Sequence, residues 1–266
     1  MLVLFEIYEM NTFDEILNIV IPMAGLGSRF ANAGYKEPKP LIMIHDKAMI
    51  EIVVDNVRPR CAHRFIFICQ TEHVEQYNML DKLHRIAPDC IIVKIDGLTE
   101  GAACTVLQAK YLIDSINPLM IVNSDQYVDC SIDNYLEKMR TDNLDGLIMT
   151  MEAKDPKWSF VGLESNNKYI ARVAEKQVIS NEATVGIYNF ARGRDFVCAA
   201  EKMIIRNERV NGEFYVAPVY NILITENAYK AGIFNVGKER NGMYGLGTPS
   251  DLDYFLSTTV AKELAE

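Results

Sequence analysis

The chain has 266 residues, a hydrophobic fraction of 49% and a formal net charge of -9. The negative balance argues against general nucleic-acid binding, which needs a broad basic face. The apolar fraction is enough for a substantial core. No apolar run in the sequence reaches the roughly 18–20 residues of a membrane helix, so no membrane partner is expected.

Six cysteines are scattered along the chain without a C-x-x-C pair, and several, such as Cys69 and Cys90, lie in or beside apolar runs. We interpret them as reduced core residues of a cytoplasmic protein. The segment Met1–Tyr8 is apolar, but it carries Glu6 and lacks a basic lead. We therefore interpret residues 1–16 as an N-terminal extension and not as a signal peptide.

Strand-like and helix-like runs alternate along the chain. The predicted strands cover residues 18–24, 65–70, 90–96, 119–123, 146–152, 159–164, 184–190 and 231–236. The predicted helices cover residues 48–57, 72–86, 101–114, 131–140, 192–206, 216–226 and 250–264. The runs at 18–24, 65–70 and 119–123 are apolar throughout, as is typical of strands buried on both faces. Ser250, followed by two acids, is predicted to cap the last helix.

The β-α-β-α order of the first half predicts a mostly parallel sheet with helices on both faces. The second half has hairpin-like spacing near Asn166–Asn167 and Gly186, so we expect a mixed sheet there. No linker, repeat or composition break divides the chain. The sequence therefore predicts one α/β domain of three layers, with halves at residues 17–150 and 151–266.

A glycine-punctuated loop follows the first predicted strand. It reads Ala24–Phe30, contains Gly25, Gly27 and Arg29, and is followed ten residues after the arginine by Lys39 between two prolines. Glycines let backbone N–H groups approach an anion, and the two cations add charge that suits a nucleoside triphosphate. The prolines are expected to hold Lys39 in extended backbone. The loop lacks the Gly-Lys-Ser/Thr of a Walker motif and the third glycine of a dinucleotide fingerprint.

A second polar segment follows the apolar run at 119–122 and contains Asp125. Ligands on open α/β sheets collect at the carboxyl ends of strands, where a carboxylate can hold Mg²⁺ beside a phosphate. A turn cap explains Asp125 equally well from the residues alone. The pair Glu175–Lys176 is typical of a solvated ion pair, and Glu213 is ambiguous.

Taken together, these motifs resemble the nucleotide-sugar pyrophosphorylases, which join a nucleoside triphosphate to a sugar 1-phosphate. The resemblance rests first on the linked pair Ala24–Arg29 and Pro38–Leu41, and runs on through Gly101–Ala103, Asn123–Asp125, Val173–Lys176, Gly186–Tyr188 and Gly247–Pro249 with Asp251. It implies a Rossmann-like α/β/α fold with a mostly parallel mixed sheet, of the nucleotide-diphospho-sugar transferase type. The sequence departs from the pattern at Asn123, at Gln177 and at Gly245, where the family has a metal-binding aspartate. A second metal ligand would then come from Asp251, Glu213 or water.

The resemblance also implies a reaction, in which an acceptor phosphate attacks the α-phosphorus of the NTP and pyrophosphate leaves. The implied catalytic residues are Arg29, Lys39 and Asp125, with Asp125 holding Mg²⁺. The implied nucleotide-binding residues are Ala24, Gly25, Leu26, Gly27, Ser28, Arg29, Gly101 and Ala102, and the implied acceptor-binding residues are Glu175, Lys176, Gly186 and Glu213. A homo-oligomer and a cytoplasmic role in supplying nucleotide sugars for polysaccharide synthesis are expected by analogy.

Three other functions remain open at this point. A cytidylyltransferase acting on a phosphorylated alcohol such as phosphocholine would use the same loop. A glycosyltransferase of related fold would need an Asp-x-Asp motif, whereas the strand end here carries Asn123–Asp125 with one acid. A nucleotide-sugar binding protein without turnover would explain the missing acid at Gly245.

Overall fold

The computed structural model describes residues 15–264, so the N-terminal extension lies almost wholly outside the described residues. The strands are β1 (Leu17–Pro22), β2 (Met43–Ile44), β3 (Lys47–Ala48), β4 (His63–Gln70), β5 (Ile91–Ile95), β6 (Leu119–Val122), β7 (Gln126–Val128), β8 (Gly146–Glu152), β9 (Ser159–Leu163), β10 (Ile170–Glu175), β11 (Glu182–Phe190), β12 (Ala231–Glu239) and β13 (Gly242–Gly245). The helices are α1 (Ser28–Asn32), α2 (Met49–Val57), α3 (Thr71–Gln76), α4 (Met79–Ile86), α5 (Ala102–Leu107), α6 (Lys110–Ile113), α7 (Ile132–Thr141), α8 (Gly193–Ile205), α9 (Val219–Asn227), α10 (Pro249–Ser257) and α11 (Thr259–Glu263), with a 3₁₀ turn η1 at Lys39–Leu41.

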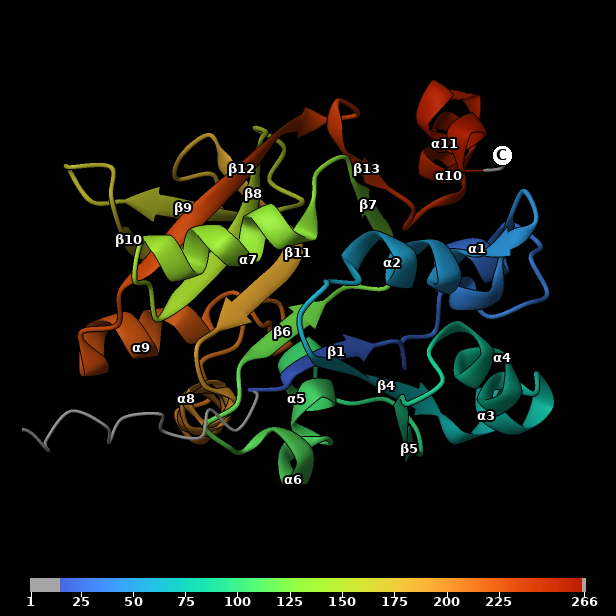
Figure 1. The fold of residues 1–266 in the computed structure, drawn as a ribbon, viewed down its shortest axis with the longest axis horizontal. Helices are drawn as coiled ribbons and strands as arrows, with labels where there is room; N and C mark the ends of the chain where they lie inside the picture. The colour runs from blue at the N-terminus through green and yellow to red at the C-terminus, as the bar shows by residue number, and fades with distance from the viewer. Residues whose placement is uncertain (1–14, 265–266) are drawn as a thin grey trace, which may run out of the picture.

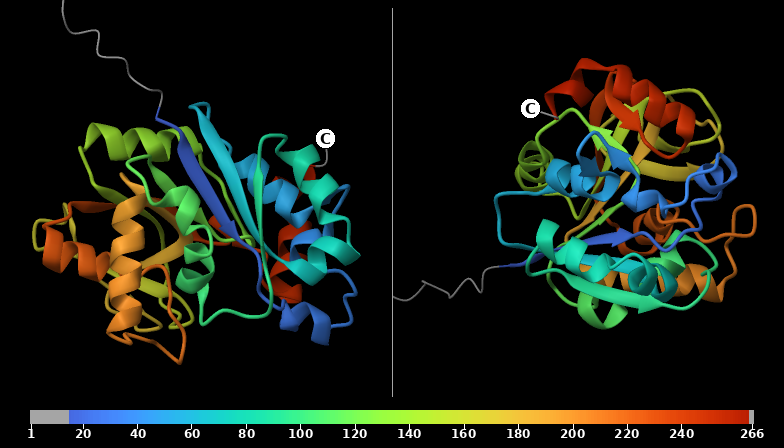
Figure 2. Two further views of the ribbon diagram at one scale, coloured as in Figure 1. Left: turned by 90° about the horizontal axis from the view of Figure 1, so that it is seen from below. Right: turned by 90° about the vertical axis from the view of Figure 1, so that its right-hand side faces the viewer.

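Alternate side chains of β1 point to opposite faces of the sheet, and each face carries its own core. Val20 packs with apolar residues of α5, α6, α8 and α9. Ile19 and Ile21 pack on the other side with residues of α2, α3, α4 and α7. The result is a layer of helices on each side of the sheet, as Figures 1 and 2 show. This arrangement confirms the predicted three-layer α/β/α fold with a mixed central sheet.

The sheet has a parallel half and a mixed half. Its strand order is β5-β4-β1-β6-β11-β8-β12-β13-β7; off this path, β9 pairs with β11 and β10 pairs with β9. Strands β5, β4, β1 and β6 are mutually parallel, whereas β11 runs antiparallel to both β6 and β8. The carboxyl ends of the first four strands therefore meet at one edge of the sheet.

A third cluster joins the two ends of the described chain. Phe30 of α1 packs with Ile42 after η1 and with Leu252 and Phe255 of α10. Figure 1 shows α10 and α11 beside α1, although more than 200 residues separate them in the sequence. The segment that carries Arg29 and Lys39 is thus held from behind by the C-terminal helices.

The structure corrects several predicted elements. The helix predicted at 72–86 is two helices, because Asn78 between them adopts a left-handed backbone with φ +48°. The helices predicted at 101–114 and 250–264 are also broken, the latter at Thr258. Thr248, not Ser250, caps α10, since its hydroxyl accepts the N–H of Asp251. The short strands β2, β3, β7, β10 and β13 were not predicted.

The cysteine prediction is right in part. All six cysteines are free, but Cys61 and Cys198 are exposed and are therefore not core residues. Burial raises the pKa of the Cys69 thiol to about 12 and that of the Cys90 thiol to about 11. Among the described residues, no helix has the length and apolar character needed to cross a bilayer.

Candidate active site

A cavity of about 410 Å³ lies where the parallel strands end. Its walls come from the loops after β1, β5 and β6, from η1 and from the segment before α9. The predicted site residues that line it are Ala24, Gly25, Leu26, Lys39, Gly101, Ala102, Asp125 and Glu213. The structure therefore brings residues from five separate stretches of sequence to one place.

At the centre of this cavity, Lys39 and Asp125 form an ion pair. The Lys39 ammonium donates to Asp125 Oδ2 at 2.7 Å, and the two side chains are 21% and 27% exposed. An ion pair with this much solvent contact contributes little to stability, of the order of 1 kcal/mol or less. Its position in the cavity is therefore more informative than its strength, because both charges face the space that a ligand would fill.

Gly27 explains how the loop after β1 and the lysine come together. Gly27 adopts a left-handed backbone with φ +60°, and a Cβ placed on it would lie 3.1 Å from the Cβ of Lys39. A larger residue at this position would strain the turn and press on the lysine stem. Gly27 and Lys39, twelve residues apart in sequence, therefore form one structural unit.

The backbone of Lys39 differs from the prediction. Pro38 is extended, with φ -54° and ψ 143°, but Lys39 opens the 3₁₀ turn η1 and is not extended. The turn is closed by the N–H of Leu41 on the carbonyl of Pro38 at 2.8 Å. Pro38 ends the extended segment and Pro40 lies within the turn, so the two prolines still restrict the direction of the Lys39 side chain.

Three predicted nucleotide-binding residues lie outside the cavity lining. Gly27 supports Lys39 from behind, whereas Ser28 and Arg29 are exposed at the start of α1. Within residues 15–264, the Arg29 guanidinium has no ion-pair partner. The arginine is therefore exposed in the first turn of α1, two residues after Gly27.

Gln70, at the end of β4, is a site residue that the sequence reasoning missed. Its carboxamide is buried and donates to the carbonyls of Ala24, at 2.7 Å, and Gly97, at 2.8 Å. It therefore ties the loop after β1 to the loop after β5. A polar residue at the end of the apolar run Phe65–Cys69 was the available signal.

Gly101 joins the predicted nucleotide loop to the acceptor half. Its φ is +124°, and a Cβ on it would lie only 2.5 Å from the backbone oxygen of Phe214. The N–H of Phe214 donates to the backbone carbonyl of Glu100 at 2.8 Å, and the N–H of Ala103 donates to the backbone carbonyl of Phe214 at 3.0 Å. This close backbone pairing brings Glu213 into the cavity.

Glu175 and Lys176 lie outside the cavity lining, at the end of β10. The Ser159 hydroxyl donates to the Glu175 carboxylate, and burial raises the pKa of Glu175 above its usual range despite this bond. The Lys176 ammonium donates to the Tyr215 hydroxyl at 2.6 Å, and this bond raises the pKa of Lys176. Tyr215 was not predicted, although it stands two residues from Glu213. Through it, the predicted acceptor residues Lys176 and Glu213 are brought together.

The deciding comparison is with a protein family. A family model described as nucleotidyl transferase matches residues 19–205, well over half of the chain, including the glycine loop, Lys39 and Asp125. This chain belongs to the nucleotidyl transferase family. It is accordingly an enzyme that transfers nucleotidyl groups. No curated protein sequence matches it.

Solved structures resemble this nucleotidyltransferase over nearly their whole length. A nucleoside-diphosphate-sugar pyrophosphorylase from Vibrio cholerae RC9 is 25% identical, with a TM-score of 0.77 over 90% of this chain and 100% of that one. A UDP-glucose pyrophosphorylase complexed with UDP-glucose is 18% identical, with a TM-score of 0.71 over 93% and 99%. An inositol-1-phosphate CTP transferase from T. maritima is 13% identical, with a TM-score of 0.70 over 91% and 95%. The last two likenesses show the shared fold.

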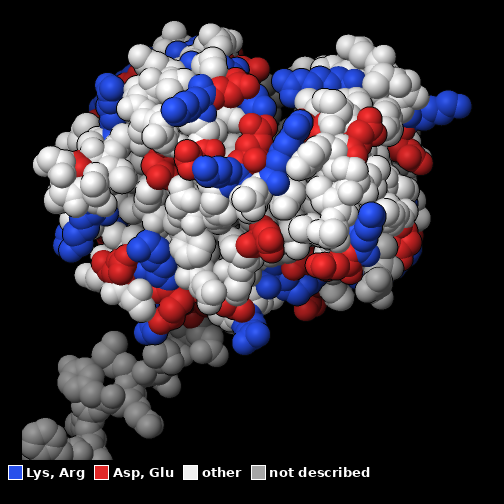
Figure 3. Space-filling model, turned by 90° about the horizontal axis from the view of Figure 1, so that it is seen from above, with Lys and Arg blue, Asp and Glu red and all other residues white. Residues whose placement is uncertain are grey.

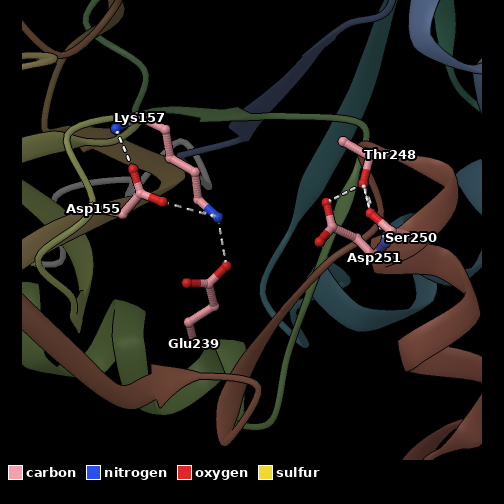
Figure 4. A network of polar contacts seen from close by, with 6 residues as sticks. All are labelled: Asp155, Lys157, Glu239, Thr248, Ser250 and Asp251. Atoms are coloured by element: carbon pink, nitrogen blue, oxygen red, sulfur yellow. Dashed lines mark hydrogen bonds and ion pairs between the residues drawn. The ribbon is translucent and has the colours of Figure 1, made fainter.

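The C-terminal turn of the nucleotidyltransferase places small residues next to Asp125. A Cβ on Gly247 would lie 2.8 Å from Asp125 Oδ2, so the missing side chain leaves one side of that carboxylate open. A Cβ on Gly245 would lie 3.8 Å from the carboxylate of Asp251. Asp251 itself is outside the cavity lining, and one of its oxygens accepts the Thr248 hydroxyl at 2.6 Å, as Figure 4 shows.

A second polar cluster holds the loop after β8. Lys157 lies 2.7 Å from Glu239 at the end of β12 and 3.8 Å from Asp155 in its own loop (Figure 4). Seen from above, basic and acidic side chains are intermixed over this face of the nucleotidyltransferase, and neither sign forms a continuous field (Figure 3). Among residues 15–264, no three His, Cys, Asp or Glu side chains converge into a group that could hold a metal ion alone.

Proposed function

We propose that this nucleotidyltransferase transfers a nucleoside monophosphate from an NTP to a sugar 1-phosphate and releases pyrophosphate. The observation that carries the proposal is the Lys39–Asp125 pair, which stands over the glycine turn inside the cavity. A cation and a carboxylate beside a glycine turn, whose backbone N–H groups can bind an anion, form an arrangement suited to the transfer of a phosphate-containing group.

Under this proposal the triphosphate lies against the loop Ala24–Gly27. Backbone N–H groups there bind the β- and γ-phosphates, and Arg29 neutralises the departing pyrophosphate. Lys39 turns from Asp125 to the α-phosphate, where negative charge develops as the acceptor oxygen attacks. The enzyme forms no covalent intermediate, so catalysis rests on positioning and charge neutralisation.

The acceptor side uses residues that other side chains hold in place. Lys176, fixed by Tyr215, binds the acceptor phosphate, with Glu175 at the end of β10 and Gly186 in β11 as the other acceptor-binding residues. Gly101 and Ala102, in the cavity lining, contact the nucleotide. The two substrates then meet at Lys39.

Asp125 also fits the role of a magnesium ligand. Mg²⁺ is usually bound by one or two carboxylates together with substrate phosphates and waters. Asp125 supplies one carboxylate with an open side beside Gly247, and Glu213 is the other acid in the lining. When bound, the ion would supply charge neutralisation for the phosphates.

The test is a panel in which the purified protein meets each NTP with Mg²⁺ and each of a set of phosphorylated acceptors. The acceptors include hexose 1-phosphates, phosphocholine and inositol 1-phosphate, and the readout is pyrophosphate. Release with a sugar 1-phosphate is the expected result. Release with phosphocholine or inositol 1-phosphate alone would replace the proposal with a transferase acting on a phosphorylated alcohol. NTP binding without release under any condition would contradict the proposal.

A further inference from the structure

Asn123, directly after β6, places a carboxamide in the wall of the cavity. Its backbone is fixed at both ends, since its N–H donates to Gly186 at 2.9 Å and its carbonyl accepts the Gln126 side chain at 2.9 Å. Its side-chain amide, in contrast, has no hydrogen-bond partner among residues 15–264. It is not sealed from solvent either, so its hydrogen-bonding groups are available to a ligand.

Gly186 fixes where this amide lies. Gly186 has φ +87°, and a Cβ on it would lie 2.3 Å from Asn123 Nδ2 and 2.7 Å from Asn123 Cγ. The Asn123 side chain therefore packs directly against Gly186, in the space that a side chain at position 186 would fill. A carboxamide held by packing, with its donors and its acceptor unused, is pre-organised to bind a polar group at little entropic cost.

The strand order shows which substrate meets this amide. Across the sheet the sequence is β5, β4, β1, β6 and β11. The loop after β5, with Gly101, lies on one side of the glycine turn, and Asn123 lies on the other, at the seam between β6 and β11. Because Gly101 marks the nucleotide side under the proposed function, Asn123 lies on the acceptor side of the reaction centre.

We infer that the Asn123 carboxamide binds a hydroxyl group of the acceptor and helps to determine which phosphorylated sugar or polyol the enzyme uses. This inference rests on the proposed function and deepens it. An amide both donates and accepts, which matches a hydroxyl that does the same. Asn123 also covers Gly186, so the acceptor meets the side chain here and not the strand backbone. Gly186, which was predicted to bind the acceptor directly, then supports the Asn123 side chain and does not contact the acceptor itself.

The test compares Asn123→Ala and Asn123→Asp with the unaltered enzyme, using the best hexose 1-phosphate of the panel and the deoxy analogues of that sugar phosphate. Asn123→Asp keeps the shape that packs on Gly186, so it protects the test against a variant that fails to fold. Asn134→Ala, the same truncation on the exposed face of α7, is the matched control. Thermal unfolding of each variant is recorded alongside.

The loss of one neutral hydrogen bond is expected to raise the KM for the acceptor by roughly 5- to 10-fold in Asn123→Ala. The KM for the NTP stays within about twofold, since the nucleotide side keeps its contacts. In Asn123→Asp the acceptor KM rises at least as much, because a second charge beside Asp125 repels the acceptor phosphate. In Asn123→Ala the preference for the sugar phosphate over one of its deoxy analogues falls, because the hydroxyl that pairs with the amide no longer contributes to binding.

Other outcomes overturn the inference. An unchanged acceptor KM in both variants means that the amide does not meet the acceptor. A rise in the KM for the NTP alone would assign the amide to the ribose. If the unaltered enzyme fails to release pyrophosphate with every acceptor of the panel, the proposed function itself fails, and the inference fails with it. If pyrophosphate is released and only the Asn123 variants are indistinguishable from the control, the inference alone fails.

Discussion

The two halves of the site are built differently. On the proposed nucleotide side, Gly25, Gly101, Lys39 and Asp125 line one cavity at the ends of parallel strands. On the proposed acceptor side, Glu175 and Lys176 lie outside the cavity lining and are held by Ser159 and Tyr215. Close backbone approaches at Gly27 and Gly101 set the first half, whereas the second half depends more on contacts between side chains. We therefore expect a side-chain truncation in the second half to disturb the backbone less than a glycine substitution at Gly27 or Gly101 does in the first.

The largest effect is expected where the two halves meet. Lys39→Ala should lower kcat by roughly 10²–10³-fold, the usual cost of one lost transition-state contact. Pyrophosphate release under saturating substrates measures this, and the unfolding temperature should change little because the ion pair is partly exposed. Lys36→Ala, an exposed lysine on the same segment, is the matched control and should keep full activity. Near-normal turnover of Lys39→Ala would remove the lysine from the mechanism.

A pair of glycine substitutions separates ligand contact from folding on the nucleotide side. Nothing lies within 4 Å of a Cβ on Gly25, so Gly25→Ala should leave the unfolding temperature unchanged. The methyl would occupy the cavity where a phosphate is proposed to lie, so the KM for the NTP should rise roughly tenfold, about the worth of one hydrogen bond. Gly101→Ala, whose Cβ meets the Phe214 backbone, should instead lower the unfolding temperature. Equal unfolding temperatures for the two variants would contradict this distinction.

On the acceptor side, a smaller effect is expected from removing one supporting hydroxyl. Tyr215→Phe deletes the bond to the Lys176 ammonium and keeps the ring on which that ammonium also rests, 4.8 Å away. The acceptor KM should rise about threefold, the effect of one modest hydrogen bond, with the KM for the NTP unchanged. Tyr111→Phe, at an exposed position, serves as the control. An equal change in both KM values would mean that Tyr215 supports the whole cavity and not the acceptor half alone.

The smallest effect concerns the buried carboxyl of Glu175. Because burial raises its pKa, the folded state holds its charged form at a cost, and this cost grows as pH rises above the ordinary value of about 4.5. Glu175→Gln, which removes the charge and keeps the shape, should unfold about 1–3 °C higher than the unaltered enzyme at pH 7. The difference should vanish near pH 4, where Glu175 is protonated. Glu164→Gln, at an exposed position, should show no such trend, and a pH-independent difference for Glu175→Gln would refute the burial argument.

The sequence predicted the buried strands well, because their signal is local, and the glycine loop and Lys39 could be singled out for the same reason, although their binding of a nucleotide stays a prediction. Apolar runs at β1, β4 and β6 need no partner to be recognised, and Gly27 and Lys39 are only twelve residues apart in the sequence. The breaks at Asn78 and Thr258 escaped prediction because amphipathic spacing continues across them. Gln70, Tyr215 and the seat of Asn123 on Gly186 depend on segments that meet only in the folded chain. The acceptor half was therefore harder to predict, because it depends on side-chain contacts between segments that are distant in the sequence.

The most direct test of the central claim is a crystal structure of the enzyme with a non-hydrolysable NTP analogue and Mg²⁺. We expect the triphosphate to lie against the Gly25–Gly27 turn, and the Lys39 ammonium to leave Asp125 and stand within about 3 Å of a phosphate oxygen. A triphosphate bound elsewhere, or a Lys39 that remains paired with Asp125 and touches no phosphate, would contradict it.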